Sequence, residues 1–538
     1  MKVRLAQINP IVGNLEYNTG LIKDIISSSR ESDIIVFPEL SLTGYPPQDL
    51  LLDKKFILET QEALADIKNI VEQQVVIIGL PVFANDSLMN SAAVIQNKEI
   101  VGYHSKVLLP TYDVFDETRY FTPSDEISPI AVMVNNINVN IGVQICEDLW
   151  DDSYSLKITE ALIDKGAEMI INISASPYRK NILDKRISLC KDRAKDLKYY
   201  FIYCNLVGGQ DELVFDGRSF VIDNNGNIKA LGKGFKEDMI DFDSEEVISS
   251  DISEARADES EEIFNALSLG VKDYFKKSGF SKAVIGLSGG IDSSLTAAIV
   301  ADALGKDNVI GVSMPSAFSS EHSKSDAKDL ADNLGIRFEM IPISELYDKI
   351  LSSMDSFFKD TPKGLAEENL QARIRGNILM AVSNKIGALV LNTGNKTELA
   401  LGYCTMYGDM CGALGVISDI NKLEVYELSK WINKTSSKVI IPENSINKKP
   451  SAELSENQYD PFDYDIVSPI VDHIINDLAD ANNLVEMGYE IDLINDIFNK
   501  IHTSEYKRRQ AAPGIKVSEK AFGMGRRYPM NNHYRYKK

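Results

Sequence analysis

Short apolar runs alternate with longer amphipathic stretches over the first 235 residues. The apolar runs are rich in valine and isoleucine and have the length of β-strands. They lie at residues 3–9, 33–39, 75–82, 137–146, 168–174 and 199–207. Stretches such as residues 15–30 and 184–197 instead place apolar side chains at helical spacing. This half predicts a layered α/β domain that closes with a hairpin at 219–231, where Asn-Gly separates two apolar runs.

The second half begins with a helical stretch at 264–279, then a strand at 282–287, a glycine-rich turn and a helix at 295–305. This order is typical of one strand–loop–helix unit of a parallel sheet. Further strands are expected at 309–315, 337–343 and 387–394. An acidic, weakly apolar stretch separates the halves. We therefore predict domains at 1–240 and 263–538, joined by an acidic linker at 241–262.

Composition narrows the function classes. With 538 residues and 44% apolar residues, the chain is long enough for more than one core. A net charge of −22 repels phosphate backbones and anionic membrane surfaces, so we expect neither nucleic acid nor membrane as a partner. No run is apolar enough for a membrane span or a secretory signal, which predicts a cytoplasmic protein. Five cysteines without CxxC spacing indicate neither a disulfide framework nor a zinc cage.

The glycine-rich turn at residues 288–294 (SGGIDSS) is the first candidate for chemistry. Its glycines let backbone N–H groups approach an anion, and the following helix N-terminus favours negative charge, so phosphate is the expected ligand. The turn lacks the lysine of a Walker A motif but contains Asp292, which would repel phosphate unless a cation lay between them. Asp292 is therefore a candidate Mg²⁺ ligand. The alternative is an ordinary glycine-rich turn capped by serine.

The complete SGGIDSS string after an apolar strand resembles the loop of the N-type ATP pyrophosphatases, which adenylate a carboxylate or carbonyl oxygen and release pyrophosphate. Their fold is a doubly wound parallel sheet. The segments at 391–398 (LNTGNKTE) and 402–410 (GYCTMYGDM) resemble NAD synthetase in particular. The resemblance implies that ATP and Mg²⁺ act with deamido-NAD in this half.

Site residues follow from the same motifs. The residues implied for ATP are Gly286, Leu287, Ser288, Gly289, Gly290, Ile291, Asp292, Ser293, Ser294, Thr393, Lys422 and Ser451, the last where the family more often has threonine. Those expected to bind deamido-NAD are Asn369, Arg373, Glu398 and Lys507, and those expected to hold Mg²⁺ are Asp292 and Glu398. Asn369 and Arg373 are four residues apart and so share one helical face, although a solvated amphipathic helix would have the same pattern.

Three residues near strand ends of the first half form a second candidate site: Glu39, Lys106 and Cys146. A thiolate is a strong nucleophile, a carboxylate can take its proton, and a lysine ammonium can lower the thiol pKa and stabilise an oxyanion. Taken singly, the cysteine would pass as a core residue and the charges as surface residues. None of the five histidines, His104 included, lies in a motif that pairs it with a cysteine, which disfavours a papain-like arrangement.

The segments around these residues (FPEL, HSK, ICEDLW) together resemble the nitrilase superfamily, and within it the glutaminase domain of glutamine-dependent NAD synthetases. The resemblance implies a four-layer α-β-β-α sandwich in which Glu39 is the base, Lys106 the oxyanion stabiliser and Cys146 the nucleophile. It also implies that Glu117 lies beside the lysine and, with Tyr112 and Ser176, serves glutamine binding. The sequence departs from the family pattern at Ile182, where a lysine is frequent.

The two resemblances together imply ATP-dependent amidation of deamido-NAD to NAD, with ammonia from glutamine and with AMP, pyrophosphate and glutamate as the other products. They also imply a homo-oligomer. One alternative keeps both domains but changes the acceptor, and another makes one half a non-catalytic scaffold. Four cysteines in neither motif role are interpreted as packing residues: Cys190, Cys204, Cys404 and Cys411.

Overall fold

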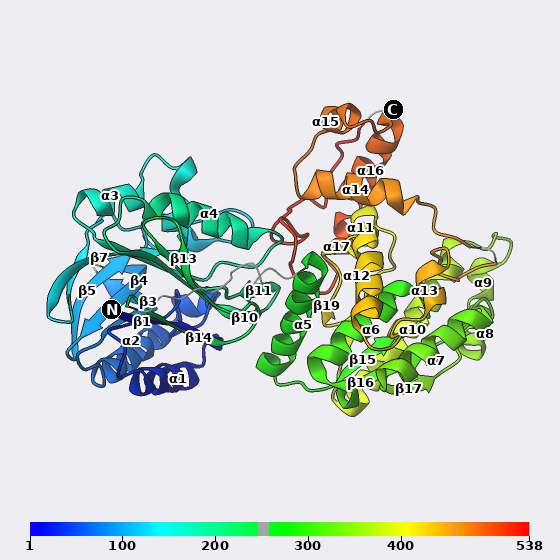
Figure 1. Cartoon of the computed structure of the whole chain (residues 1–538). Helices are drawn as coiled ribbons and strands as arrows, with labels where there is room; N and C mark the ends of the chain where they lie inside the picture. Colours follow the sequence, from blue (N-terminus) through cyan, green and yellow to red (C-terminus); the bar gives the residue numbers. More distant parts are fainter. Residues whose placement is uncertain (85, 246–257, 457, 537–538) are drawn as a thin grey trace. The chain divides into compact units, whose positions relative to one another are not determined.

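The computed structural model describes residues 1–84, 86–245, 258–456 and 458–536. The chain divides into two compact units, Met1–Ala257 and Asp258–Lys538, which Figure 1 shows in blue to green and in green to red. Both ends of the predicted linker belong to regular elements, since β14 (Asp238–Asp243) enters it and α5 (Glu259–Ser278) starts within it. Its middle, residues 246–257, lies outside the described residues, so the domain bounds remain a prediction.

The first unit is built from short strands and four α-helices in its described residues. The strands are β1 (Lys2–Gln7), β2 (Ile34–Val36), β3 (Val75–Ala84), β4 (Ser87–Gln96), β5 (Glu99–Ser105), β6 (Ile130–Val134), β7 (Ile137–Ile145), β8 (Met169–Ser174), β9 (Tyr200–Asn205), β10 (Val207–Gln210), β11 (Leu213–Asp216), β12 (Phe220–Asp223), β13 (Ile228–Leu231) and β14. The helices are α1 (Leu15–Ser28), α2 (Lys54–Lys68), α3 (Ile158–Asp164) and α4 (Ile182–Ala194).

These strands form two six-stranded sheets, in the orders β14-β1-β2-β3-β4-β5 and β13-β12-β9-β8-β7-β6. In each sheet the central strands pair in parallel and the outer ones antiparallel. The predicted strands are thus confirmed, and so is the hairpin, whose strands are β12 and β13. Figure 1 shows α1 and α2 on one side of the sheets and α3 and α4 on the other. This is the expected four-layer α-β-β-α sandwich.

Burial explains why central strands such as β2 are wholly apolar. Because side chains alternate along a strand, Ile34 and Val36 of β2 face the second sheet, while Ile35 packs with Ile22 and Ile26 of α1. A strand that is covered on both faces has no solvent side and so carries no polar alternation. The polar residues that remain at strand ends are therefore conspicuous.

The second unit has one five-stranded sheet and many helices. Its strands are β15 (Ala283–Gly286), β16 (Val309–Ser313), β17 (Arg337–Met340), β18 (Leu389–Asn392) and β19 (Leu414–Gly415). Its helices are α5, α6 (Ile291–Leu304), α7 (Glu321–Leu334), α8 (Ser344–Ser353), α9 (Asp355–Phe358), α10 (Leu365–Ile386), α11 (Lys396–Leu401), α12 (Lys422–Thr435), α13 (Glu443–Asn447), α14 (Tyr464–Ile475), α15 (Ala481–Glu486), α16 (Ile491–Thr503) and α17 (Glu505–Arg508).

The sheet order is β17-β16-β15-β18-β19, and all its pairings are parallel. The order reverses between β15 and β18, which is the switch point of a doubly wound sheet, as predicted. Helix α6 packs on β15 and β16, and α10 packs on β15 and β18. Ligands in such folds bind beyond the carboxyl ends of the strands at this point. None of the helices in the described residues is both long and apolar enough to cross a membrane.

Candidate active sites

Glu39, Lys106 and Cys146 come together at the ends of three strands of the first unit. Glu39 follows β2, Lys106 follows β5, and Cys146 follows β7. The Lys106 Nζ donates to Glu39 Oε1 at 2.7 Å. The other Glu39 oxygen accepts the backbone N–H of Ala175, just after β8, at 2.8 Å. All three side chains are buried, so sheet pairing brings together groups that are far apart in sequence.

Glu117 completes this cluster, at the place the sequence predicted beside the lysine. Its Oε1 accepts from Lys106 Nζ at 2.8 Å and from the Tyr45 hydroxyl at 3.1 Å. Asn90, on β4, donates to Glu39 Oε1 at 2.8 Å and lies 3.5 Å from Glu117 Oε2. The lysine therefore lies between two carboxylates that a tyrosine and an amide hold in place.

Electrostatics in this buried site correct one expectation. We expected Lys106 to lower the pKa of the Cys146 thiol, but the pKa is raised well above its usual value. Burial disfavours the thiolate most and the Glu39 charge adds to the effect, which outweighs the opposing attraction of Lys106. The resting thiol is therefore neutral and would need a base to react, and the Glu39 carboxylate, predicted as that base, lies in the same cluster.

The pKa values of Lys106 and Glu117 are shifted as well. Burial opposes the charge on Lys106, but the Glu117 and Glu39 carboxylates outweigh it and raise the lysine pKa well above its usual value. Burial raises the pKa of Glu117 to about 7, against the stabilising effect of Lys106. The lysine thus stays an ammonium, while Glu117 exchanges its proton near neutral pH.

Cys146 is held in an unusual backbone conformation, with φ at 42° in the left-handed region. Non-glycine residues seldom adopt this region, and they do so where the surroundings impose it, often at functional sites. The residue opens a short 3-10 turn, Cys146–Leu149, directly after β7. The sharp turn presents the thiol at the strand end.

The residues predicted for glutamine have distinct surroundings. Half of the Tyr112 side chain is exposed, and its hydroxyl donates to Glu147 Oε2 at 2.8 Å. Tyr154 donates to the same carboxylate at 3.0 Å. Ser176 is buried, and its hydroxyl accepts from Arg186 at 3.0 Å. Ile182 is buried at the start of α4. Glutamine binding by Tyr112, Glu117 and Ser176 stays a prediction.

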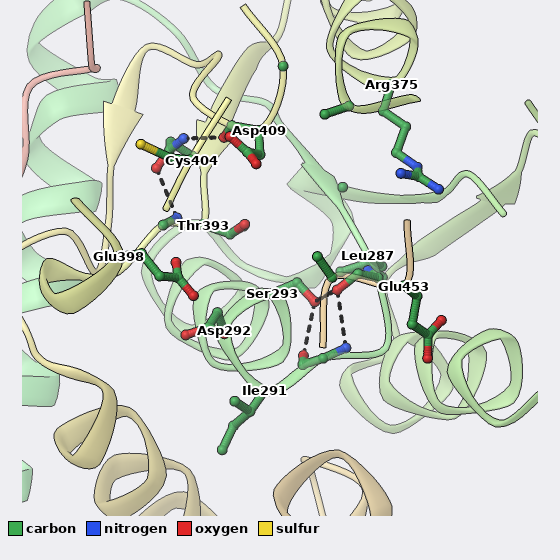
Figure 2. Close-up of a pocket in the computed structure, with 18 of the residues that line it drawn as sticks. Leu287, Ile291, Asp292, Ser293, Arg375, Thr393, Glu398, Cys404, Asp409 and Glu453 are labelled. Atoms are coloured by element: carbon green, nitrogen blue, oxygen red, sulfur yellow. Dashed lines mark hydrogen bonds between the residues drawn. The ribbon is translucent and has the colours of Figure 1, made fainter. Parts of the chain in front are cut away.

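A cavity of about 300 Å³ lies at the switch point of the second unit's sheet. The motif residues that line it are Gly286, Leu287, Ser288, Gly290, Ile291, Asp292, Ser293, Thr393, Glu398, Lys422 and Ser451. Figure 2 shows the Asp292 and Glu398 carboxyl groups together at one end and Arg375 with Glu453 at the other. Most residues predicted for ATP therefore surround one hollow.

Gly289 and Ser294 belong to the glycine-rich turn but do not line the cavity, and both stabilise the shape of the turn. Gly289 has φ at +76°, and a Cβ there would lie 2.3 Å from the Ser323 carbonyl oxygen, so only glycine fits. Ser294 is buried, and its hydroxyl donates to the Gly290 carbonyl at 2.8 Å. The Gly290 N–H donates to the Ser288 hydroxyl at 3.1 Å. The turn is thus folded tightly against α7 with its backbone facing the cavity.

Asp292, Glu398 and Lys422 form the charged end of the cavity. Lys422 pairs closely with Asp292, and its Nζ lies 3.5 Å from Glu398 Oε1. Asn395, the N-cap of α11, donates to Asp292 Oδ1 at 2.9 Å and accepts from the Glu398 N–H at 3.0 Å. The Asn395 backbone N–H also donates to Glu398 Oε2 at 3.3 Å, so this one residue contacts both carboxylates.

This charge arrangement suits a divalent cation. Burial raises the pKa of Glu398 to about 8, and the nearby Asp292 charge adds to this rise while Lys422 opposes it. Within the described residues, no cluster of three carboxylate, histidine or cysteine side chains could hold a metal alone. Mg²⁺ is usually held by one or two carboxylates together with substrate phosphate oxygens, and the two carboxylates fit that arrangement.

The other residues predicted for deamido-NAD lie beyond the cavity lining. Asn369 accepts from the Thr405 hydroxyl at 2.6 Å. Arg373 is exposed and its Nε donates to the Met406 carbonyl at 3.3 Å. Lys507 Nζ donates to the carbonyls of Gly402 and Cys404 at 2.7 and 2.8 Å. All three contact the segment 402–406, so they share one region, and their role in binding stays a prediction.

Sequence reasoning missed several cavity residues. Arg375 lies two positions after Arg373 and faces the cavity, where burial lowers its pKa to about 10. Burial raises the pKa of Asp409 to about 6. Asp409 lies inside the segment 402–410 that carried the resemblance, so that segment contained its signal. The sequence carried no signal for Arg375. Arg373 and Arg375 lie two positions apart on one helix, and only the orientation of that helix determines which of them faces the cavity.

The cysteines divide into two groups. Cys190 and Cys204 are buried, as expected of packing residues. Cys404 and Cys411 are partly exposed and line the cavity, so they are more than packing residues. Burial raises the pKa of the two thiols to about 12 and about 11, so both are neutral. They form a polarisable part of the wall rather than a nucleophilic one.

Comparisons with known proteins agree with both sites. Residues 2–257 match the carbon-nitrogen hydrolase family and residues 263–511 the NAD synthase family. The chain is 42% identical to the glutamine-dependent NAD(+) synthetase of Synechocystis over 98% of both chains, and 40% identical to that of Thermotoga maritima over 99% of both.

Solved structures agree as well. A glutamine-dependent NAD⁺ synthetase from Acinetobacter baumannii, in complex with ADP, superposes with a TM-score of 0.79 and 36% identity over 98% of both chains. One from Cytophaga hutchinsonii has a TM-score of 0.84 at 21% identity over 99% of this chain and 98% of the other, which shows the shared fold. The chain belongs to the family of glutamine-dependent NAD(+) synthetases.

Proposed function

We propose that this protein converts deamido-NAD to NAD, using ATP and the amide nitrogen of glutamine and releasing AMP, pyrophosphate and glutamate. The observation that supports this most strongly is the presence of both sites in one chain. The Glu39, Lys106 and Cys146 cluster belongs to the first unit, and the loop at 288–294 with Asp292 and Glu398 belongs to the second. Full-length similarity to glutamine-dependent NAD(+) synthetases supports the same pairing.

In the first unit the reaction begins with the neutral Cys146 thiol. Glu39 takes the proton as the sulfur attacks the glutamine carboxamide carbon, and Lys106 stabilises the negative charge on the oxygen. The proton then passes to the leaving nitrogen, and ammonia departs to leave a thioester. Water attacks the thioester with Glu39 again as base, which releases glutamate and restores the thiol. Tyr112, Glu117 and Ser176 are the residues we propose for holding glutamine.

In the second unit a carboxylate oxygen of deamido-NAD attacks the α-phosphorus of ATP, and pyrophosphate leaves. The backbone of residues 288–294 would hold the phosphates at the N-terminus of α6, with Thr393, Lys422 and Ser451 at the nucleotide. Asp292 and Glu398 would hold Mg²⁺, which when bound neutralises phosphate charge during the transfer. We propose that Asn369, Arg373, Glu398 and Lys507 bind deamido-NAD.

Ammonia then displaces AMP from the adenylated carboxylate and forms the amide. Ammonium has no lone pair, so a proton acceptor is needed if the nitrogen arrives charged. Asp409 lines the cavity, and its pKa of about 6 keeps it ionised at neutral pH, so it is our candidate for this acceptor. Thiols without disulfide partners suit a reducing compartment, and we propose the cytoplasm as the site of action. The family resemblance implies a homo-oligomer, which light scattering would test.

The experiment supplies the purified protein with ATP, MgCl₂, deamido-NAD and glutamine labelled with ¹⁵N in its side-chain amide. We expect labelled NAD and equal amounts of AMP, and we expect Cys146→Ala to lose this product while still making NAD from ammonium chloride. Unlabelled NAD, ADP as the nucleotide product, or amidation of a different carboxylate acceptor would contradict the proposal. If Cys146→Ala lost NAD formation from both glutamine and ammonium chloride, this would contradict the assignment of glutamine hydrolysis to the first unit and amidation to the second.

A further inference from the structure

One buried carboxylate, that of Asp148, ties the turn that carries Cys146 to the strand end that carries Lys106. Asp148 lies two residues after Cys146 and is fully buried. Its Oδ1 accepts the backbone N–H groups of Val107 and Leu108 at 3.0 and 2.9 Å. Its Oδ2 accepts the N–H of Ile145 at 3.0 Å. Three of its partners are thus peptide groups next to the nucleophile or the lysine.

The fourth partner is His104, whose Nε2 lies 3.1 Å from Asp148 Oδ2. His104 is buried on β5, two residues before Lys106. Among the described residues no hydrogen bond joins His104 to Cys146. The histidine therefore contacts the carboxylate rather than the thiol, and both sides of Lys106 are linked to one group.

The hydrogen bonds of Asp148 restrain a strained part of the backbone, the turn at Cys146. Cys146 has its left-handed φ of 42°, a strained conformation for a non-glycine residue that persists where surrounding contacts enforce it. The Ile145 N–H bond restrains the residue before this turn, and the two N–H bonds after Lys106 fix that chain at the same carboxylate. Hydrogen bonds to a charged acceptor are stronger than neutral ones, and a fully buried carboxylate is not weakened by water.

We propose that Asp148 is a positioning residue for glutamine hydrolysis, which holds the Cys146 sulfur and the Lys106 ammonium at the separation the reaction requires. The inference rests on the proposed glutaminase function of the first unit. Asp148 touches neither thiol nor substrate, so its effect acts through geometry. A misplacement of about 1 Å between reacting groups can cost roughly 100-fold in rate.

The test is Asp148→Asn in the full-length protein. The new amide keeps one acceptor oxygen but turns an N–H₂ group toward donors, so part of the four-bond arrangement is lost. We expect glutamine-dependent kcat to fall roughly 100-fold while the KM for glutamine changes less than about threefold. We also expect alkylation of Cys146 by iodoacetamide to slow, and NAD formation from ammonium chloride to stay at the wild-type rate.

A matched control is Asp151→Asn, three residues further along. Asp151 is also buried and accepts the Ile158 N–H at 2.8 Å and pairs with Arg193, but it bonds to nothing beside Lys106 or Cys146. We expect its kcat and alkylation rate to match those of the wild type. Equal losses in both variants would mean general loosening and would overturn the proposal, as would wild-type kcat in Asp148→Asn.

A second variant keeps the proposal testable if Asp148→Asn does not fold. His104→Gln removes one of four partners and leaves the three backbone bonds, so we expect a kcat loss of a few-fold with unchanged KM. No change in kcat or in alkylation would then count against the proposal. A wild-type protein that does not hydrolyse glutamine would instead contradict the proposed function, so the two failures are distinguishable.

Discussion

Each of the two candidate active sites holds one lysine between two carboxylates. In the first unit Lys106 bonds to Glu39 and Glu117 at 2.7 and 2.8 Å, and all three groups are buried. In the second unit Lys422 pairs with Asp292 and lies 3.5 Å from Glu398, at the edge of the cavity. The same residue types thus occur once in a closed cluster and once beside open space.

The difference shows what each lysine does. Lys106 is almost fully buried between its two carboxylate partners, so we propose that its charge stays with this cluster throughout the reaction. Lys422 borders the cavity in which we propose that phosphates and Mg²⁺ bind, where its carboxylate partners could exchange one cation for another. In our proposal, a lysine between carboxylates is therefore a catalytic group where it is enclosed and a temporary partner of the carboxylates where it lies beside open space.

The largest expected effect comes from removing each lysine. In Lys106→Met two buried carboxylates lose their partner, and we expect the first unit to lose roughly 3 to 5 kcal/mol of stability together with glutamine hydrolysis. In Lys422→Met we expect a smaller loss that MgCl₂ largely restores. The only two tryptophans, Trp150 and Trp431, lie in different units, so urea unfolding of variants with one tryptophan replaced by phenylalanine measures each unit. Equal rescue of both variants by MgCl₂ would contradict the comparison.

The next effect concerns the loop beside the second site. In Gly289→Ala the new Cβ would meet the Ser323 carbonyl oxygen at 2.3 Å, at a φ of +76°. We expect NAD formation to fall roughly 100-fold with either nitrogen donor, while glutamine hydrolysis persists. Gly305→Ala is the control, because Gly305 has φ at +79° but no atom within 4 Å of the new Cβ. A similar loss in the control would mean that backbone strain alone is responsible.

A moderate effect on pH dependence is expected at Glu117. Its folded-state pKa of about 7 lies above the usual value near 4.3, so the folded form binds the proton more tightly than the unfolded chain. The stability it contributes is complete below about pH 4.3 and is lost as pH rises through about 7. We expect the free energy of unfolding to fall between about pH 4.3 and 7 by roughly 1 to 3 kcal/mol less in Glu117→Gln than in the wild type. Urea unfolding midpoints, followed by the fluorescence of Trp150, measure this difference. An unchanged pH profile would contradict a protonated Glu117 beside Lys106.

The smallest effect distinguishes two tyrosines of the first site. Tyr112 and Tyr154 both donate to Glu147, but only Tyr112 is proposed to contact glutamine. We expect Tyr112→Phe to raise the KM for glutamine about fivefold, the value of one hydrogen bond, and Tyr154→Phe to leave it nearly unchanged. Equal effects would mean that both act only by holding Glu147.

Much of the fold could be predicted because buried strands leave a plain signal. The run at 33–39 is apolar on both faces and ends in Glu39, whereas the run at 137–146 alternates apolar residues with Asn138, Asn140 and Gln144 and ends in Cys146. Glu39 is conspicuous as a charge at the end of a buried run, whereas Cys146 taken singly would pass as a core residue and is singled out by the motif around it. The start of α5 was placed five residues late, because its first turn, from Glu259, is acidic rather than apolar.

The rest of the sites depends on contacts that sequence does not reveal. Asn90 and Asp148 reach their partners through strand pairing, 51 and 41 positions away in the chain. The direction of the Cys146 pKa depends on whether burial or Lys106 dominates, and burial is a property of the folded unit. Local patterns identify residue types, whereas three-dimensional packing decides their charge states.

The raised pKa of the Cys146 thiol also affects how readily this residue is oxidised. Peroxides attack thiolates far more readily than protonated sulfur, so a thiol whose pKa is raised by burial offers oxidants little to react with. Burial, which makes the sulfur harder to ionise, also protects it from sulfenic acid formation. In the mechanism we propose, the same burial that makes a base necessary during the reaction thus protects the thiol between reactions.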